Sequence, residues 1–549
     1  MRISLAYLCL VILIFALVGC NNQEADRIYV NAVIWTGDSS NANASVIAIK
    51  GNKIVYVGND SNAVTAIEKI DLKGKMMVPG FIDDHTHFLM GGYSLSSVKL
   101  KDAKSKQDFI NILKQYCTEH PGNEWIGGGD WNNDAWGGEM PQKEWIDSVT
   151  GDHPLAITRY DGHVLLANTK ALMLARISRS TPDPFGGTII RSSSGEPTGV
   201  LKDEAMELVN KIIPSHSEKQ LSTYLEDASN HAISNGVTQV HDVGMYGGFT
   251  ELKTYRDAHK KNQLKVRVYS FVPLQKWKQM ADYVRENGKG DDFLKWGGVK
   301  GFVDGSLGAI TAWFYEPYLD QPNSKGFNIT DTTDIIHWVK SADSVGLQVV
   351  VHAIGDHAID FILNVFENTI KENGASNRRF RIEHTQHFSE ASIPRFKKLN
   401  VSASMQPYHL YDDGSFAPKR LDSARLSRTY AFKTLLNAGA NVCFGSDWTV
   451  APLDPILGIH AAVTRQTSDG KNPAGWYPEQ KLTVEEALKC YTDNNAYGVN
   501  QENLLGKLKV GFLADFAVID KNLLAIPSNE IKNAKVVMTV INGNEVYKK

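Results

Sequence analysis

The sequence predicts an α/β protein: a (β/α)8 barrel of the TIM type with a large insertion, and a small β-sandwich built from both termini. Two observations lead to this fold class. The middle of the chain alternates short apolar strands with helical stretches, which indicates parallel strands buried beneath helices. Both ends are β-rich, and the middle is long enough for a barrel with additional segments.

The β-rich ends are expected to form one domain from residues 20–79 and 491–549. Gly51 and Asn52 separate two β-prone runs, as in a hairpin. A similar turn at Gly543 follows the last long run. The expected strands are Arg27–Trp35, Ser45–Lys50, Lys53–Gly58, Asp515–Asp520 and Val536–Ile541.

The barrel is expected over residues 80–490. Apolar runs that follow helical stretches predict its strands at Val237–Asp242, Leu347–His352, Phe380–His384 and Asn441–Asp447. Residues of about 101–230 are rich in Trp and Gly and fit this alternation poorly. We interpret them as an insertion that covers the active-site face.

The first 19 residues are typical of a secretory signal, because Arg2 supplies a positive charge and residues 5–18 are almost continuously apolar. The following Leu17–Cys20 segment resembles the lipobox of bacterial lipoproteins. The resemblance implies cleavage before Cys20 and acylation of its thiol. The protein would then be exported and anchored to the cell envelope, in the periplasm or at the outer face of a bacterial membrane. An ordinary cleaved signal or an uncleaved anchor helix are the alternatives.

The composition is that of a globular protein, with 42% hydrophobic and 22% charged residues. A formal net charge of −3 argues against nucleic acid or an anionic membrane surface as a partner, so membrane contact is expected through the N-terminal lipid only. A small-molecule substrate is a separate expectation, which follows from the site residues below. Beyond the signal and Cys20, the remaining cysteines are Cys117, Cys443 and Cys490, which form no recognisable disulfide or zinc-finger pattern.

Polar side chains lie where the predicted barrel strands end. A strand that starts at Met76 reaches His85 and His87, which share one face because alternate residues of a strand do. Later strands end at His352, His384 and Asp447. All strand ends of one kind meet at one rim of a barrel, so these side chains indicate a metal site with nitrogen and oxygen ligands. Taken singly, each histidine is as consistent with a structural role.

Four segments, in order along the chain, closely resemble the metal motifs of the amidohydrolase superfamily: Val78–His87, Val351–Asp356, Arg381–Gln386 and Phe444–Trp448. The branch that contains the N-substituted formamide deformylases is indicated by three more: Arg159–His163, Gly236–Asp242 and Val299–Ser306. The likeness spans about residues 27–549.

The resemblance implies a role for each matching residue. His85 and His87 would hold the more buried of two divalent metals, and His352 and His384 the second. Asp447 would contact the buried metal and act as general acid and base. Zinc is the first expectation for the metals, with iron, nickel or manganese as alternatives.

Lys300 is the candidate for the carboxylated lysine that often bridges the two metals in this superfamily. It lies in an apolar strand, where a free ammonium would be costly to bury. The alternative is an unmodified lysine that pairs with Asp304 or with the substrate, and the site would then hold a single metal.

The predicted reaction is hydrolysis of a non-peptide C–N bond, of the N-acyl or N-formyl amide type, by a metal-activated hydroxide that attacks the carbonyl. Arg159 and His163 would bind substrate or stabilise the oxyanion, or else support the insertion structurally. A cyclic amide hydrolase, a deaminase or an esterase would use the same site, and a non-catalytic surface binding lipoprotein is the alternative of another class. The other histidines, among them His357, His409 and His460, are expected to be structural.

Overall fold

The computed structural model describes residues 24–159, 163–244 and 247–549, so Cys20 and the predicted signal at residues 1–19 lie outside the described residues. The chain forms two compact units. The larger combines the chain up to Leu89 with Ala228–Lys549, and the smaller comprises Met90–Asp227. Among the described helices, none combines the length and the apolar character needed to cross a bilayer.

The larger unit contains a barrel of eight parallel strands, which confirms the predicted fold class. Their order is β21–β20–β19–β18–β17–β16–β15–β8. The strands are β8 (Phe81–Thr86), β15 (Val237–Asp242), β16 (Arg267–Pro273), β17 (Leu294–Phe302), β18 (Gln348–Ala353), β19 (Arg381–His384), β20 (Ser402–Met405) and β21 (Val442–Phe444). The segment after β21 returns to β8, where Asp447 N donates to His85 O at 2.7 Å and His87 N to Trp448 O at 2.8 Å. These bonds nearly close the barrel at its C-terminal rim.

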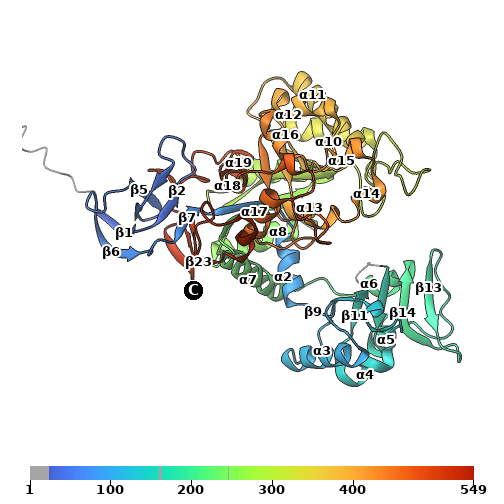
Figure 1. Cartoon of the computed structure of the whole chain (residues 1–549). Coiled ribbons are helices and arrows are strands. Elements are labelled where there is room, and N and C mark those ends of the chain that lie inside the picture. Colours follow the sequence, from blue (N-terminus) through green and yellow to red (C-terminus); the bar gives the residue numbers. More distant parts are fainter. Residues whose placement is uncertain (1–23, 160–162, 245–246) are drawn as a thin grey trace, which may run out of the picture. The chain divides into compact units, whose positions relative to one another are not determined.

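Helices surround the barrel on its outer side (Figure 1). They include α7 (Glu218–Ser234), α8 (Phe249–Lys260), α9 (Trp277–Asn287), α10 (Thr332–Ser344), α11 (Asp356–Asn373), α12 (Ile393–Leu399), α16 (Phe432–Asn437), α17 (Pro455–Thr464) and α18 (Val484–Cys490). In α11, Ile359, Leu363 and Phe366 recur at helical spacing and are buried. Asp331 caps α10 by accepting a hydrogen bond from Thr333 N at 2.8 Å. Burial of one face and capping of the end therefore stabilise these helices.

The predicted continuous strand from Met76 to His87 is wrong. The structure divides it into β7 (Met76–Pro79), which belongs to the β-sandwich, and β8, which belongs to the barrel. Gly80 lies between them, and a Cβ at this position would come within 2.3 Å of the Thr238 side chain. The chain can therefore pass from one domain to the other only with a residue that lacks a side chain.

The predicted strand Arg27–Trp35 is also two strands, β1 (Glu24–Val30) and β2 (Val33–Trp35). Asn31 separates them with a φ of 54°, in the left-handed region that Asn tolerates better than most residues. The two strands belong to different sheets. The turn thus lets one short segment contribute to both layers of the sandwich.

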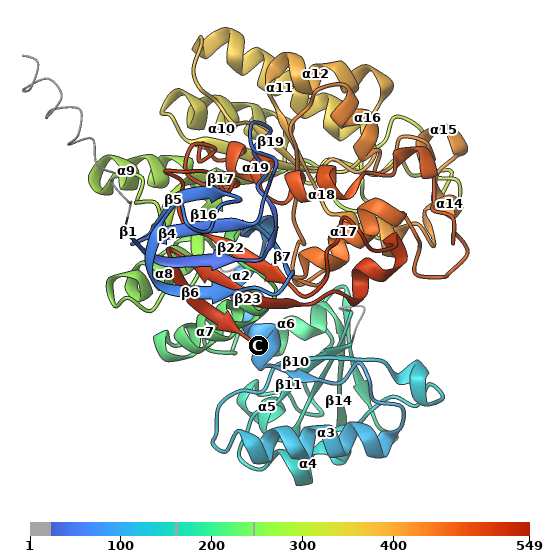
Figure 2. The ribbon, with the colours of Figure 1, turned by 60° about the vertical axis from the view of Figure 1, so that its left-hand side comes forward.

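The sandwich packs a four-stranded sheet, β5–β4–β1–β6, on a six-stranded sheet, β24–β23–β22–β7–β2–β3. The further strands are β3 (Asn43–Ala44), β4 (Val46–Lys50), β5 (Lys53–Gly58), β6 (Thr65–Asp71), β22 (Phe516–Ile519), β23 (Val536–Ile541) and β24 (Asn544–Lys548). Tyr29 meets Phe516 edge to face in the core between the sheets, at 5.1 Å between ring centres. Figure 2 shows the blue N-terminal strands beside the red C-terminal ones, so the predicted sandwich from both termini is confirmed.

The smaller unit has its own mixed sheet, β13–β14–β12–β11–β10–β9. Its strands are β9 (Val98–Lys99), β10 (Gly128–Trp131), β11 (Ala156–Arg159), β12 (Val164–Ala167), β13 (Gly187–Arg191) and β14 (Pro197–Asp203), and its longer helices are α3 (Lys106–Glu119) and α4 (Lys143–Thr150). Trp131 and Trp145 are buried in an apolar cluster with Phe109. The tryptophans of this region therefore build an independent core. Its role as a cover for the active site stays a prediction.

Candidate metal centre

Three buried side chains converge at the C-terminal rim of the barrel: His85, His384 and Asp447. One donor atom of each lies within 4.8 Å of the other two. Asp447 Oδ1 is 3.5 Å from His85 Nε2 and 3.2 Å from His87 Nε2. The donors come from β8, from the end of β19 and from the segment after β21, so the barrel topology alone brings them together.

His352 and Lys300 complete this cluster. The His352 ring, on β18, lies 4.4 Å from the His384 ring between centroids. Lys300 Nζ, on β17, lies 3.5 Å from His85 Nε2. All six predicted metal residues therefore lie at one place, and their assignment as ligands stays a prediction.

Each of the four histidines has one ring nitrogen held by a protein oxygen. The contacts are His85 Nδ1 with Glu383 Oε2 at 2.5 Å, His87 Nδ1 with Gly244 O at 3.1 Å, His352 Nε2 with Gly305 O at 3.0 Å, and His384 Nδ1 with Gln406 Oε1 at 2.9 Å. Such bonds fix the orientation and the tautomer of a histidine and leave its other nitrogen for a metal. The donor set therefore fits a divalent ion of the zinc type.

Burial sets the protonation of these groups. It lowers the pKa of His85 to about 4 and that of His352 to about 3, with the Lys300 ammonium contributing to both shifts. The imidazoles are therefore neutral at neutral pH, as metal ligation requires. Burial opposes ionisation of Asp447. At the low pH where this carboxyl titrates, however, the His85 imidazole is protonated, and its charge together with the contact to His87 holds the pKa of Asp447 below its usual range.

The backbone at the site adopts an uncommon conformation. His384 has a φ of 71°, Thr385 of 43° and Asp447 of 56°, all in the left-handed region that non-glycine residues rarely occupy. The bond from Asp447 N to His85 O, at 2.7 Å, holds the last of these residues in place. Local strain of this kind occurs where the surrounding structure must aim a functional side chain.

A buried network of charges lies behind His85, and sequence reasoning did not assign it. Arg381 Nε donates to Glu383 Oε1 at 2.5 Å, and Ser404 Oγ donates to Glu383 Oε2 at 2.8 Å. Asp84 lies 3.7 Å from Arg381. Glu383 thus joins His85 to a guanidinium. An acidic residue in a buried strand, directly before His384, was the available signal.

The alternative pairing of Lys300 with Asp304 is not present. The Asp304 carboxylate accepts hydrogen bonds from the backbone amides of Trp313, Ile354 and Gly355, at 2.7–3.0 Å. Burial lowers the pKa of Lys300 to about 8. Carboxylation of Lys300 stays a prediction.

The predicted substrate residues Arg159 and His163 belong to the smaller unit. Arg159 Nε donates to Asn133 Oδ1 at 2.9 Å, and His163 Nδ1 lies 3.0 Å from Asp203 Oδ1. Their role in substrate binding stays a prediction.

His409, which was expected to be structural, lies closer to the candidate metal centre than its sequence position suggested. Its Nε2 lies 3.7 Å from Asp447 Oδ2, so it borders the candidate metal centre. His409 follows β20 at the same rim, but that strand ends without a polar residue that would have drawn attention to it.

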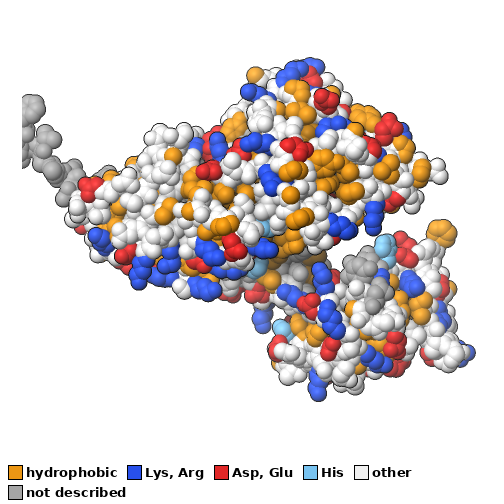
Figure 3. Space-filling model, viewed as in Figure 1, with side chains coloured by type: hydrophobic (Ala, Val, Ile, Leu, Met, Phe, Trp, Pro, Cys, Tyr) orange, Lys and Arg blue, Asp and Glu red, His pale blue; other side chains and the backbone are white. Residues whose placement is uncertain are grey.

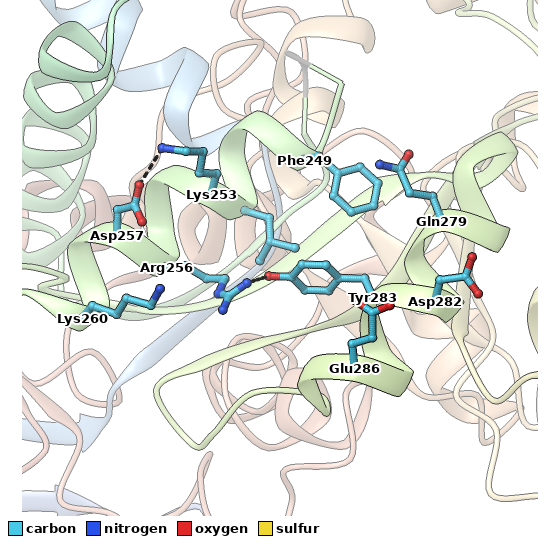
Figure 4. Close-up of a pocket in the computed structure, with 10 residues that line it drawn as sticks. Phe249, Lys253, Arg256, Asp257, Lys260, Gln279, Asp282, Tyr283 and Glu286 are labelled. Atoms are coloured by element: carbon cyan, nitrogen blue, oxygen red, sulfur yellow. Dashed lines mark hydrogen bonds and ion pairs between the residues drawn. The ribbon is translucent and has the colours of Figure 1, made fainter.

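The outer surface of the larger unit differs from this rim. On the face in Figure 3, acidic and basic side chains are interspersed. A cleft of about 470 Å³ is lined by residues of α8 and α9. Lys253 bonds Asp257 at 2.8 Å there, and Arg256 bonds the hydroxyl of Tyr283 (Figure 4). The charged side chains of this cleft therefore hydrogen-bond to one another, whereas the histidine and aspartate donors at the barrel rim converge on one point.

An eight-stranded parallel barrel with buried histidines and an aspartate at its C-terminal rim defines the class of metal-dependent barrel hydrolases. The model of the amidohydrolase family matches residues 68–547, and the chain belongs to this family.

Similar proteins extend over almost the whole chain. Protein LONG AFTER FAR-RED 3 from Arabidopsis thaliana is 38% identical, with coverage of 95% of this chain and 92% of that protein. The putative amidohydrolase YtcJ from Bacillus subtilis is 33% identical, with coverage of 88% and 91%. The crystal structure of an uncharacterized metal-dependent hydrolase from Pyrococcus furiosus is 30% identical, with a TM-score of 0.75 and coverage of 91% and 99%.

Proposed function

We propose that this protein hydrolyses N-acyl or N-formyl amides, which contain a non-peptide C–N bond. The observation that carries the proposal is the convergence of four oriented histidines around an ionised Asp447. The N-substituted formamide deformylase of Arthrobacter pascens is 24% identical to this chain, with coverage of 95% of the chain and 98% of that protein. That likeness supports the choice of an open-chain amide over a cyclic one.

His85, His87 and Asp447 would hold one divalent metal and His352 and His384 the second, and carboxylated Lys300 would be a ligand shared by both. Zinc suits this set of imidazole and carboxylate donors best, and iron, nickel and manganese accept the same ligands. When bound, such metals supply an activated water and polarise the carbonyl group that it attacks.

Asp447 would move the proton. Its carboxylate is buried and ionised and lies among the predicted metal ligands, so it can accept a proton from the attacking water. It would then deliver this proton to the amide nitrogen as the C–N bond breaks. The products are a carboxylic acid, which is formate when the substrate is a formamide, and a free amine.

Lys300 would become an anionic ligand. Its neutral amine adds to carbon dioxide and loses a proton, which gives a carbamate. A lysine whose pKa burial has lowered to about 8 offers the required free amine at a moderate pH. The anion then replaces an ammonium that lies 3.5 Å from His85 Nε2 and would oppose metal binding.

The test joins metal analysis to a substrate panel. Protein purified without chelator should contain zinc or a similar metal, and should hydrolyse N-formylbenzylamine or N-acetylbenzylamine in preference to hydantoin, adenosine and phenyl acetate. Preference for one of the last three would favour the cyclic amide hydrolase, the deaminase or the esterase. Protein that binds no divalent metal would contradict the proposal and favour a binding protein.

We also propose that the protein is exported and held at the cell envelope by acyl chains on Cys20. The apolar run of residues 5–18, directly before Gly19 and Cys20, supports this location. The substrate would then be a small molecule outside the cytoplasm.

A further inference from the structure

His409 is a buried histidine with an unsatisfied nitrogen. It lies on α13 (Pro407–Asp413), and only 8% of its surface is exposed. Among the described residues, none is within hydrogen-bond reach of its Nε2. Leaving a buried polar atom unpaired costs free energy, so a binding partner from outside the protein is the simplest compensation.

The unsatisfied nitrogen faces the candidate catalytic carboxylate. His409 Nε2 lies 3.7 Å from Asp447 Oδ2, which is beyond hydrogen-bond distance. The other oxygen, Oδ1, faces His85 and His87. Asp447 is therefore flanked by the metal histidines at one oxygen and by His409 at the other.

The ring of His409 also lies parallel to that of His384, with an interplanar angle of 9° and 6.2 Å between centroids. Gln406, which orients His384 through its Nδ1, precedes His409 by a single helical turn. The segment after β20 thus positions a predicted metal ligand and His409 together.

We infer that His409 is a further catalytic residue, whose Nε2–H donates a hydrogen bond to the carbonyl oxygen of the scissile amide. This inference rests on the proposed function, because it places that amide beside Asp447, within reach of His409 Nε2. Negative charge develops on the carbonyl oxygen as water attacks, so a donor aimed at it stabilises the transition state more than the bound substrate. The proton stays on His409, while Asp447 transfers the proton that the leaving nitrogen needs.

The test compares His409→Leu and His409→Gln in the full-length, metal-loaded protein with N-formylbenzylamine as substrate. The leucine variant should lose about 10²-fold in kcat, with KM changed far less, as expected for one lost oxyanion donor. The glutamine variant keeps an N–H donor and should retain most of kcat. Metal content and melting temperature should match the wild type in both.

His460 provides a matched control. It is also buried, and its Nε2 also has no partner among the described residues, but it lines a separate cavity with Tyr408 and Tyr411. His460→Leu should leave kcat unchanged. Equal losses from His409→Leu and His460→Leu, a kcat within twofold of wild type in His409→Leu, or a fall explained by lost metal would each overturn the inference.

A binding measurement separates this inference from the proposed reaction. Acetohydroxamate presents a carbonyl oxygen to a zinc-loaded site without being hydrolysed as an amide. His409→Leu should weaken its binding at least tenfold in calorimetry, while His409→Gln should not. Failure of the wild type on every amide would refute the proposed function, whereas unchanged acetohydroxamate binding in His409→Leu would refute the role of His409.

Discussion

The two ends of the barrel use charged residues in opposite ways. At the N-terminal end, Arg267 at the start of β16 makes a bidentate ion pair with Asp515, at 2.6 and 2.9 Å. Arg378 pairs with Asp343 in the same way, at 2.6 and 2.9 Å. At the C-terminal rim, by contrast, Asp447 lacks an arginine partner among the described residues and faces histidine nitrogens.

The ion pairs at the N-terminal end stabilise the fold. The imidazole and carboxylate groups at the C-terminal rim are instead arranged to bind a ligand. A buried ion pair with complete hydrogen bonds is self-sufficient, and removing one partner destabilises the protein. Convergent imidazole and carboxylate donors gain their partner only when a metal binds. The difference agrees with the general division of such barrels into a stability face and a catalytic face.

The largest expected effect comes from breaking the functional end alone. Asp447→Asn removes the proton acceptor but retains the shape of the side chain. We expect kcat to fall by about 10²–10⁴-fold, while the melting temperature changes little. Steady-state kinetics on N-formylbenzylamine measure the loss, and full activity in this variant would exclude Asp447 as the acid and base.

The matched substitution at the other end is Asp515→Asn. It leaves the buried Arg267 without its carboxylate, and we expect the free energy of unfolding to fall by about 3–5 kcal/mol. The folded fraction should keep a kcat near that of the wild type. Urea unfolding measures the stability, and steady-state kinetics measure kcat. A large drop in kcat without loss of stability would contradict the division of the barrel into a stability end and a catalytic end.

Lys300→Met should remove a predicted metal ligand and lower activity, but it should raise the free energy of unfolding of the metal-free protein. The native pKa of about 8 lies below the ordinary 10.5, so the native state binds fewer protons than the unfolded state between these pH values. The metal-free wild type therefore gains stability as pH rises through this window. Below pH 8 the methionine variant should be more stable by roughly 3 kcal/mol, and above 10.5 the advantage should vanish. A constant difference across that range would contradict the assigned burial of the ammonium.

Glu383→Gln tests the network behind His85. The neutral amide holds the Nδ1 proton of His85 less strongly, so zinc affinity should fall by about 10–100-fold. Competition with a chelator measures this affinity. Glu502→Gln, which removes the charge beside Arg379 at the N-terminal end, is the control and should bind zinc like the wild type.

The smallest effect on chemistry is expected for Cys20→Ser. Loss of the thiol should release the protein from the membrane fraction and abolish incorporation of labelled palmitate, while kcat stays unchanged. Continued acylation or membrane retention would refute anchoring through Cys20.

Sequence reasoning succeeded where a pattern is local. The hairpin around Gly51 and the strand Val237–Asp242 depend on neighbouring residues, and both are present as β4–β5 and β15. The predicted strand from Met76 to His87 was wrong because apolar residues continue from β7 into the start of β8 and only Gly80 separates the two strands. The strands β16 and β20 end in Pro273 and Met405, so they had no terminal histidine or aspartate to mark them.

The sequence by itself determined the barrel class, the sandwich of the two termini and the convergence of His85, His352, His384 and Asp447. It could do so because parallel strands of a barrel all end at one rim, whatever their loops contain. Only the tertiary structure decided which nitrogen of each histidine is free, and that Glu383, Gln406 and His409 border the site. These contacts join side chains distant along the chain, such as His85 and Glu383, 298 positions apart. Their geometry depends on packing, for which the local pattern of residues carries no signal.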